Sequence, residues 1–130
     1  MPTIKIYGLP SVKVGALVEE ATAIDREMLR RAIKRDIIRE VPELMLGRGE
    51  KDIYVRFMKE EVPEGDKFIA VDVELFDRPE RTPAVLKKLV FEIACTITRM
   101  YTEFEVEVGP VNVVNEEIGS VCRRGRDYKP

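Results

Sequence analysis

The second residue of the chain is a proline, and it offers chemistry that the side chains of this protein do not. The initiator methionine is usually removed when the next residue is as small as proline, which leaves Pro2 with a free secondary amine. An α-amino group has an ordinary pKa of about 8, and burial beside a cation lowers that pKa. Pro2 is therefore a candidate general base near neutral pH. If Met1 is retained, this base is lost.

The other chemistry is limited by the absence of histidine from the chain. A Ser-His-Asp triad, a Cys-His pair and a HExxH zinc site are all excluded. Cys95 lies in an apolar run and is expected in the core, while Cys122 lies in a basic tail, so the cysteines indicate neither a disulfide framework nor a metal site. Gly47-Arg48-Gly49 is too short for a dinucleotide fingerprint. We expect no metal and no cofactor.

A base that moves a proton between carbon and oxygen needs a cation to hold the substrate carboxylate and to stabilise the developing oxyanion. Arg78 and Arg81 are the candidates for this role. They lie where a predicted strand is followed by a helix, whose amino terminus offers further N–H donors to an anion. The alternative interpretation is a solvated loop in which Glu80 is a neighbour of both arginines.

Hydrophobic periodicity predicts the elements that must position these residues. In chain order they are a strand over 2–7, a helix over 14–40, a loop over 44–51, a strand over 53–58, a turn over 62–66, a strand over 69–76, a helix capped by Thr82 and running to Met100, and a strand over 104–108. Met28 belongs to the apolar stripe expected on the first helix. Gly109-Pro110 is expected to end the last strand. Residues 111–130 are then a short strand or coil tail with the basic run Arg123-Arg124-Gly125-Arg126.

These elements form two βαβ units in a single domain over residues 1–130. Each unit should have parallel strands and a right-handed crossover, which gives an α+β fold, βαββαβ, with a four-stranded sheet and both helices on one face. The open face is mixed in charge and should meet either water or a polar oligomer centre. Its predicted residues are Lys5, Tyr7, Tyr54, Arg56, Asp72, Glu74, Glu105 and Glu107.

Met1-Pro2 followed by this order of elements resembles the tautomerase superfamily, which includes 4-oxalocrotonate tautomerase, macrophage migration inhibitory factor and malonate semialdehyde decarboxylase. The stretch from Val71 to Arg78 is similar to one in an uncharacterised bacterial branch, a domain of unknown function. The resemblance implies a homotrimer and an amino-terminal proline that works as acid or base. The stretch from Arg78 to Thr82 is similar to the segment that supplies the substrate-binding arginines in the malonate semialdehyde decarboxylase branch. Arg78 matches by its position before Pro79, whereas Arg81 stands one residue later than the second arginine of that branch.

Two classes of function stay open. The first is a cofactor-independent proton-transfer enzyme, a keto–enol tautomerase or isomerase, acting on a small carboxylated molecule, with a decarboxylase or hydratase as variants of the same site. The second is a non-catalytic trimer that binds a ligand or a protein. A net charge of −2 argues against a nucleic-acid partner. No apolar stretch of about 18 residues occurs, so we expect no membrane span and a cytoplasmic location.

Overall fold

The computed structural model describes residues 2–9, 18–44, 46–58, 67–76, 78–115 and 119–123. The turn expected over 62–66 and residues 124–130 of the basic tail lie outside these ranges. The elements are β1 (Thr3–Tyr7), α1 (Val18–Glu40), the 3₁₀ helices η2 (Pro42–Leu44) and η3 (Gly49–Asp52), β2 (Tyr54–Phe57), β3 (Phe68–Phe76), α2 (Pro83–Met100), β4 (Glu105–Asn115) and β5 (Gly119–Arg123). The loop expected over 44–51 therefore contains short helical turns.

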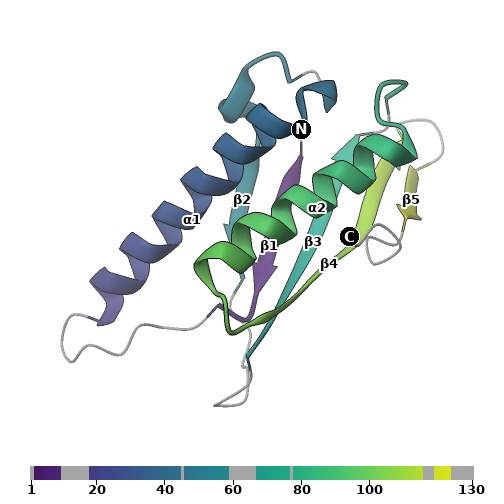
Figure 1. The fold of residues 1–130 in the computed structure, drawn as a ribbon. Helices are drawn as coiled ribbons and strands as arrows, with labels where there is room; N and C mark the ends of the chain where they lie inside the picture. The colour runs from purple at the N-terminus through teal and green to yellow at the C-terminus, as the bar shows by residue number, and fades with distance from the viewer. Residues whose placement is uncertain are drawn as a thin grey trace.

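The strands form one mixed sheet in the order β2-β1-β3-β4-β5. Strand β1 is parallel to β2, and β3 is parallel to β4, as two βαβ units require. The two units join where β1 runs antiparallel to β3. Both helices cover the same face of the sheet (Figure 1). The predicted α+β fold, with βαββαβ order and two helices on one face, is therefore confirmed.

The hydrophobic core lies between this face of the sheet and the helices. Every second residue of a strand points into it. Ile69, Val71, Val73 and Leu75 of β3 are each at most 1% exposed, while the residues between them face away from the helices. On α2, Thr82 caps the helix, because its side-chain oxygen accepts a hydrogen bond from the Val85 amide (3.3 Å), with Pro83 at the first helical position. The cap predicted from the sequence is confirmed.

The prediction for the end of the sheet was wrong. Within the described residues the sheet has five strands rather than four, because β4 continues through Gly109 and Pro110 to Asn115 and pairs with an antiparallel strand, β5. The register of β3 against β4 shifts between Val71 and Val73, where one extra residue of β4 makes a bulge. Gly109 has φ 140° there, a conformation that glycine adopts without strain. A glycine and a residue without an N–H are tolerated at a bulge, so they do not end the strand.

Two more expectations about side chains need correction. Met28 was expected on the buried stripe of the first helix, but it is 57% exposed, and its neighbour Leu29 is fully buried instead. Cys95 was expected in the core and is only partly buried. Burial nonetheless raises the pKa of its thiol, and the nearby Glu92 raises it further.

A buried carboxylate joins the two helices. Asp36 on α1 is 1% exposed and accepts a hydrogen bond from the Thr96 hydroxyl of α2 (2.8 Å). Three guanidinium groups surround the same carboxylate, from Arg39 (3.1 Å), Arg35 (3.4 Å) and Arg99 (3.8 Å). A buried carboxylate keeps its charge at acceptable cost only when such donors replace water. Asp36 therefore ties α1 to α2 at a defined position along both helices.

Gly8 follows β1 in a conformation that only glycine adopts easily, with φ +86°. A Cβ at this position would lie 2.4 Å from the main-chain oxygen of Phe68. We expect Gly8→Ala to lower the free energy of unfolding by about 1–2 kcal/mol, measured by urea denaturation. Gly47→Ala is the control, because a Cβ there meets nothing within 4 Å, and it should change stability by less than about 0.5 kcal/mol. Equal effects of the two changes would contradict this account.

Candidate functional site

Pro2, the candidate base, lies at the start of a strand held on both sides. Its side chain is buried, and its carbonyl accepts a hydrogen bond from the Tyr54 amide of β2 (2.9 Å). On the other side, Thr3 is paired with Glu74 of β3, so Pro2 comes level with Leu75 in the antiparallel register. Ile4 and Ile6, which follow it, are at most 1% exposed. The position of Pro2 is therefore fixed by the two neighbouring strands and by the core.

The same register brings Arg81 to the same end of the sheet. Strand β3 ends at Phe76, just beyond the level of Pro2, and the Phe76 carbonyl accepts a hydrogen bond from Nη1 of Arg81. Figure 1 shows the start of β1 and the amino-terminal end of α2 at one end of the sheet. Arg81 is 4% exposed, so its guanidinium is a buried charge at this end. The hydrogen bond from Nη1 has a structural role, because it holds the end of β3, and it uses part of the donor capacity of the Arg81 guanidinium.

Arg78 lies on the turn between β3 and α2, and its side chain is exposed. The turn is closed by a hydrogen bond from the Arg81 amide to the Arg78 carbonyl (2.9 Å). The structure thus brings Pro2 and Arg81 to one end of the sheet as buried groups, and it places Arg78 at that end facing solvent. An exposed guanidinium is free to move toward an anion, whereas the buried Arg81 is held in place.

Two residues at this end were not among the sequence candidates. Tyr54 contributes the amide that fixes Pro2, and Asp52 lies two residues before it. The Asp52 carboxylate accepts hydrogen bonds from the backbone amide (2.8 Å) and from Nε (3.1 Å) of Arg48. These bonds hold the pKa of Asp52 below its usual range, the backbone bond most strongly. A pairing between distant strands brings these residues to Pro2, and no local sequence pattern indicates it.

The open face carries the predicted mixture of charges. Lys5 is paired directly with Asp72 across β1 and β3, and Arg56 is paired with Lys5 across β2 and β1. Three aromatic residues also lie on this face, and they are 45%, 39% and 41% exposed: Tyr54, Phe68 and Phe76. The face is therefore part aromatic and part charged, and in one protomer it is open to solvent.

The described ranges contain no cluster of three or more cysteine or acidic side chains arranged to hold a metal ion. Within the same ranges, no helix has the length and apolar character needed to cross a membrane.

Solved structures with a similar fold cover nearly the whole chain. The structure described as the R7 fused 4-OT wild-type asymmetric trimer has a TM-score of 0.59 at 12% sequence identity, over 96% of this chain and 97% of that chain. The F6 fused 4-OT wild-type asymmetric trimer gives 0.55 at 12% identity with the same coverage. The crystal structure of native Ps01740 gives 0.50 at 18% identity, over 87% of this chain and 92% of that chain. No protein-family model and no curated protein matches the sequence.

Here 4-OT is the abbreviation of 4-oxalocrotonate tautomerase. At these identities the likeness concerns the fold, and it confirms the tautomerase-like fold that the sequence predicts. The closer similarity to an uncharacterised bacterial branch stays a prediction, as do the roles of Pro2, Arg78 and Arg81.

Proposed function

We propose that the protein is a cofactor-independent proton-transfer enzyme of the keto–enol tautomerase type. Its substrate is a small carboxylated molecule, Pro2 is the catalytic base, and Arg78 and Arg81 bind the substrate anion. The observation that carries this proposal is the position of Pro2. It is a buried residue at the start of a central strand, at the same sheet end as the buried guanidinium of Arg81.

The proposed reaction moves one proton within the substrate. The Pro2 nitrogen takes the proton from the enol hydroxyl, and the electron pair of the broken O–H bond becomes the π bond of the ketone. The electron pair of the former C=C π bond takes the proton back from Pro2 and forms the new C–H bond. The amine ends as it began, so no co-reactant is consumed. This chemistry requires that Met1 be removed, because a proline nitrogen within a peptide bond is not basic. A fixed strand favours the reaction by holding the nitrogen in one place.

The arginines supply the positive charge that the reaction needs. A guanidinium binds a carboxylate with two parallel hydrogen bonds. In the proposal, the exposed Arg78 meets the incoming carboxylate, and the buried Arg81 contributes a fixed positive potential. A nearby cation also disfavours the protonated amine, so it lowers the pKa of Pro2 and increases the fraction present as free base at neutral pH.

We also propose that the active form is a homotrimer. Two structures of the same fold are described as asymmetric trimers of fused 4-OT. The open sheet face, with Tyr54, Phe68 and Phe76 partly exposed between charged rows, suits contact with a second copy better than contact with water alone.

The test is a pH profile on protein whose amino terminus has been identified. Intact mass should show a chain that lacks Met1. The kcat/KM for ketonisation of 2-hydroxymuconate or of the enol of phenylpyruvate should then rise with pH, with unit slope below an apparent pKa of about 8 or lower. The sign follows from the chemistry, because only the unprotonated amine can accept the proton. A retained Met1, or a rate independent of pH between about 5 and 9, would contradict the proposal.

A second candidate function is a non-catalytic trimer that binds a ligand or a protein. Two observations favour it: the Pro2 side chain is buried, and one guanidinium nitrogen of Arg81 already donates a hydrogen bond to the Phe76 carbonyl. In that case Pro2 serves to pack the start of the sheet. The same mass and rate measurements distinguish the two functions, because a non-catalytic protein shows no ketonisation above the buffer rate.

A further inference from the structure

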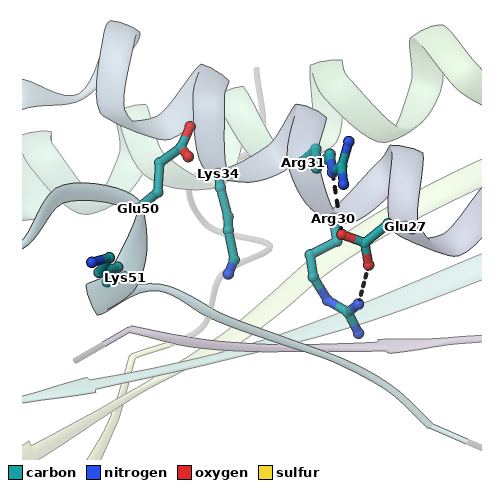
Figure 2. Close-up of a pocket in the computed structure, with 6 residues that line it drawn as sticks. All are labelled: Glu27, Arg30, Arg31, Lys34, Glu50 and Lys51. Atoms are coloured by element: carbon teal, nitrogen blue, oxygen red, sulfur yellow. Dashed lines mark hydrogen bonds and ion pairs between the residues drawn. The ribbon is translucent and has the colours of Figure 1, made fainter.

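A pocket of about 210 Å³ lies between α1 and η3, and none of the residues proposed for proton transfer lines it. Figure 2 shows that its walls are side chains of these two elements. The lining residues are Glu27, Arg30, Arg31, Lys34, Glu50 and Lys51. The four residues from α1 follow a spacing of three, one and three, so they share one stripe of the helix. The pocket is thus lined by four cations and two carboxylates.

One of the carboxylates is already neutralised. Glu27 pairs with Arg30 (2.5 Å) and with Arg31 (3.3 Å), and the hydrogen bond from Arg30 is the main reason that the pKa of Glu27 lies below its usual range. The Arg30 guanidinium also lies 5.1 Å from the centre of the Phe57 ring, which holds it in place. Glu27, Arg30 and Arg31 together therefore carry a net positive charge on this side of the pocket, and Arg30 is held in place.

The other side carries two ammonium groups without a counterion. Within the part of the chain that the structure describes, neither Lys34 nor Lys51 forms an ion pair, although Lys34 is partly buried. Glu50 is the other carboxylate of the lining, but Figure 2 shows its carboxylate and the Lys34 ammonium pointing in different directions. The six side chains therefore leave an excess of two positive charges around the pocket.

We propose that this pocket binds a small dianionic oxyanion, in the form of inorganic phosphate or a phosphate monoester. A dianion matches the excess charge, with Lys34 and Lys51 as compact charge donors and Arg30 as the fixed donor beside them. A monocarboxylate would leave one lysine uncompensated. The inference does not rest on the proposed proton-transfer function, because Pro2, Arg78 and Arg81 do not line this pocket.

The experiment is a titration of the ¹⁵N-labelled protein with inorganic phosphate at constant ionic strength, followed through the amide signals of Lys34, Gly49 and Lys51. These signals should shift and saturate. Lys34→Gln and Lys51→Gln should each weaken binding by about threefold to tenfold, as expected for the loss of one partly exposed charge contact. Glu50→Gln should tighten binding, because it removes the repulsive charge. Lys87→Gln, an exposed lysine on α2, is the matched control and should leave the affinity unchanged.

Two comparisons decide whether the site is specific. Acetate at the same ionic strength should give no saturable shift at these amides. Equal binding of acetate, or an affinity for phosphate that Lys34→Gln and Lys51→Gln leave unaltered, would overturn the proposal. Glycerol phosphate then distinguishes the two sources of the dianion. Tighter binding than inorganic phosphate identifies a phosphate monoester as the ligand, and weaker binding identifies the free anion.

Discussion

Converting the Pro2 nitrogen into an amide should lower the kcat/KM for ketonisation by about 10²- to 10⁴-fold, the range expected when a general base is removed. The change is an alanine inserted between Met1 and Pro2. It retains the proline ring and the Pro2 carbonyl that binds the Tyr54 amide (2.9 Å), but leaves no free amine on the proline. Steady-state kinetics with phenylpyruvate measure the effect, and unfolding by urea shows whether the fold is kept.

Pro2→Ala is the companion variant. It retains an α-amine but loses the ring, so it should lower the rate less than the insertion does, by about tenfold or more. Arg78→Gln separates base from anion binding, because it should raise KM for a carboxylated substrate more than it lowers kcat. Lys87→Gln controls for the loss of an unrelated positive charge. Full activity of both Pro2 variants would reject the role of this residue and leave the non-catalytic function.

Asp36→Ala should lower the free energy of unfolding by about 2–4 kcal/mol, the largest effect we expect from a charged residue of this protein. Asp36 is 1% exposed and accepts hydrogen bonds from Thr96 (2.8 Å) and Arg39 (3.1 Å). The loss is limited because its partners have alternatives. The Thr96 hydroxyl can donate instead to the Glu92 carbonyl (2.9 Å), and Arg39 is exposed and can return to water.

Urea denaturation measures this effect, and two variants on the same helix calibrate it. Asp36→Asn keeps the shape and an acceptor for Thr96, so it should cost less than Asp36→Ala. Glu40→Ala removes a partly exposed carboxylate whose one ion pair within the described residues is with its neighbour Arg39, and it should change stability by less than about 0.5 kcal/mol. If Asp36→Ala were no more destabilising than Glu40→Ala, the two helices would not depend on this carboxylate.

The sequence predicted those parts of the fold that depend on local periodicity. The alternation of β3 is complete, so its buried face could be assigned residue by residue, and the Thr82-Pro83 start of α2 is a local signal. Met28 and Leu29 show where periodicity is not enough. Adjacent apolar residues lie about 100° apart around a helix, and only the packing of the helix on the sheet decides which one is buried.

Strand β4 shows a second limit. Gly109-Pro110 is a strong local signal for a chain break, but pairing with β3 on one side and β5 on the other turns it into a bulge. The extra residue keeps Val111 facing the core, since Val108 and Val111 are both fully buried. Such a register shift depends on long-range pairing, which a single sequence does not display.

The candidate site also has a part that the sequence predicted and a part that only the structure shows. Pro2, Arg78 and Arg81 were found from residue type and from their place relative to predicted elements. The burial of Arg81, the contact of Pro2 with Tyr54 and the position of Asp52 depend on strands that meet from distant parts of the chain. The pocket between α1 and η3 was also beyond sequence reasoning, because no local pattern indicates that these two elements line one cavity.

The place of β1 within the sheet has a consequence for how the protein is made. Strand β1 lies between β2 and β3, and neither partner exists until residues 54–57 and 68–76, respectively, have been synthesised. Strand β1 therefore stays unpaired until at least the first of these segments has been made. Under the proposed function, Met1 is removed during that interval, before the sheet closes around Pro2.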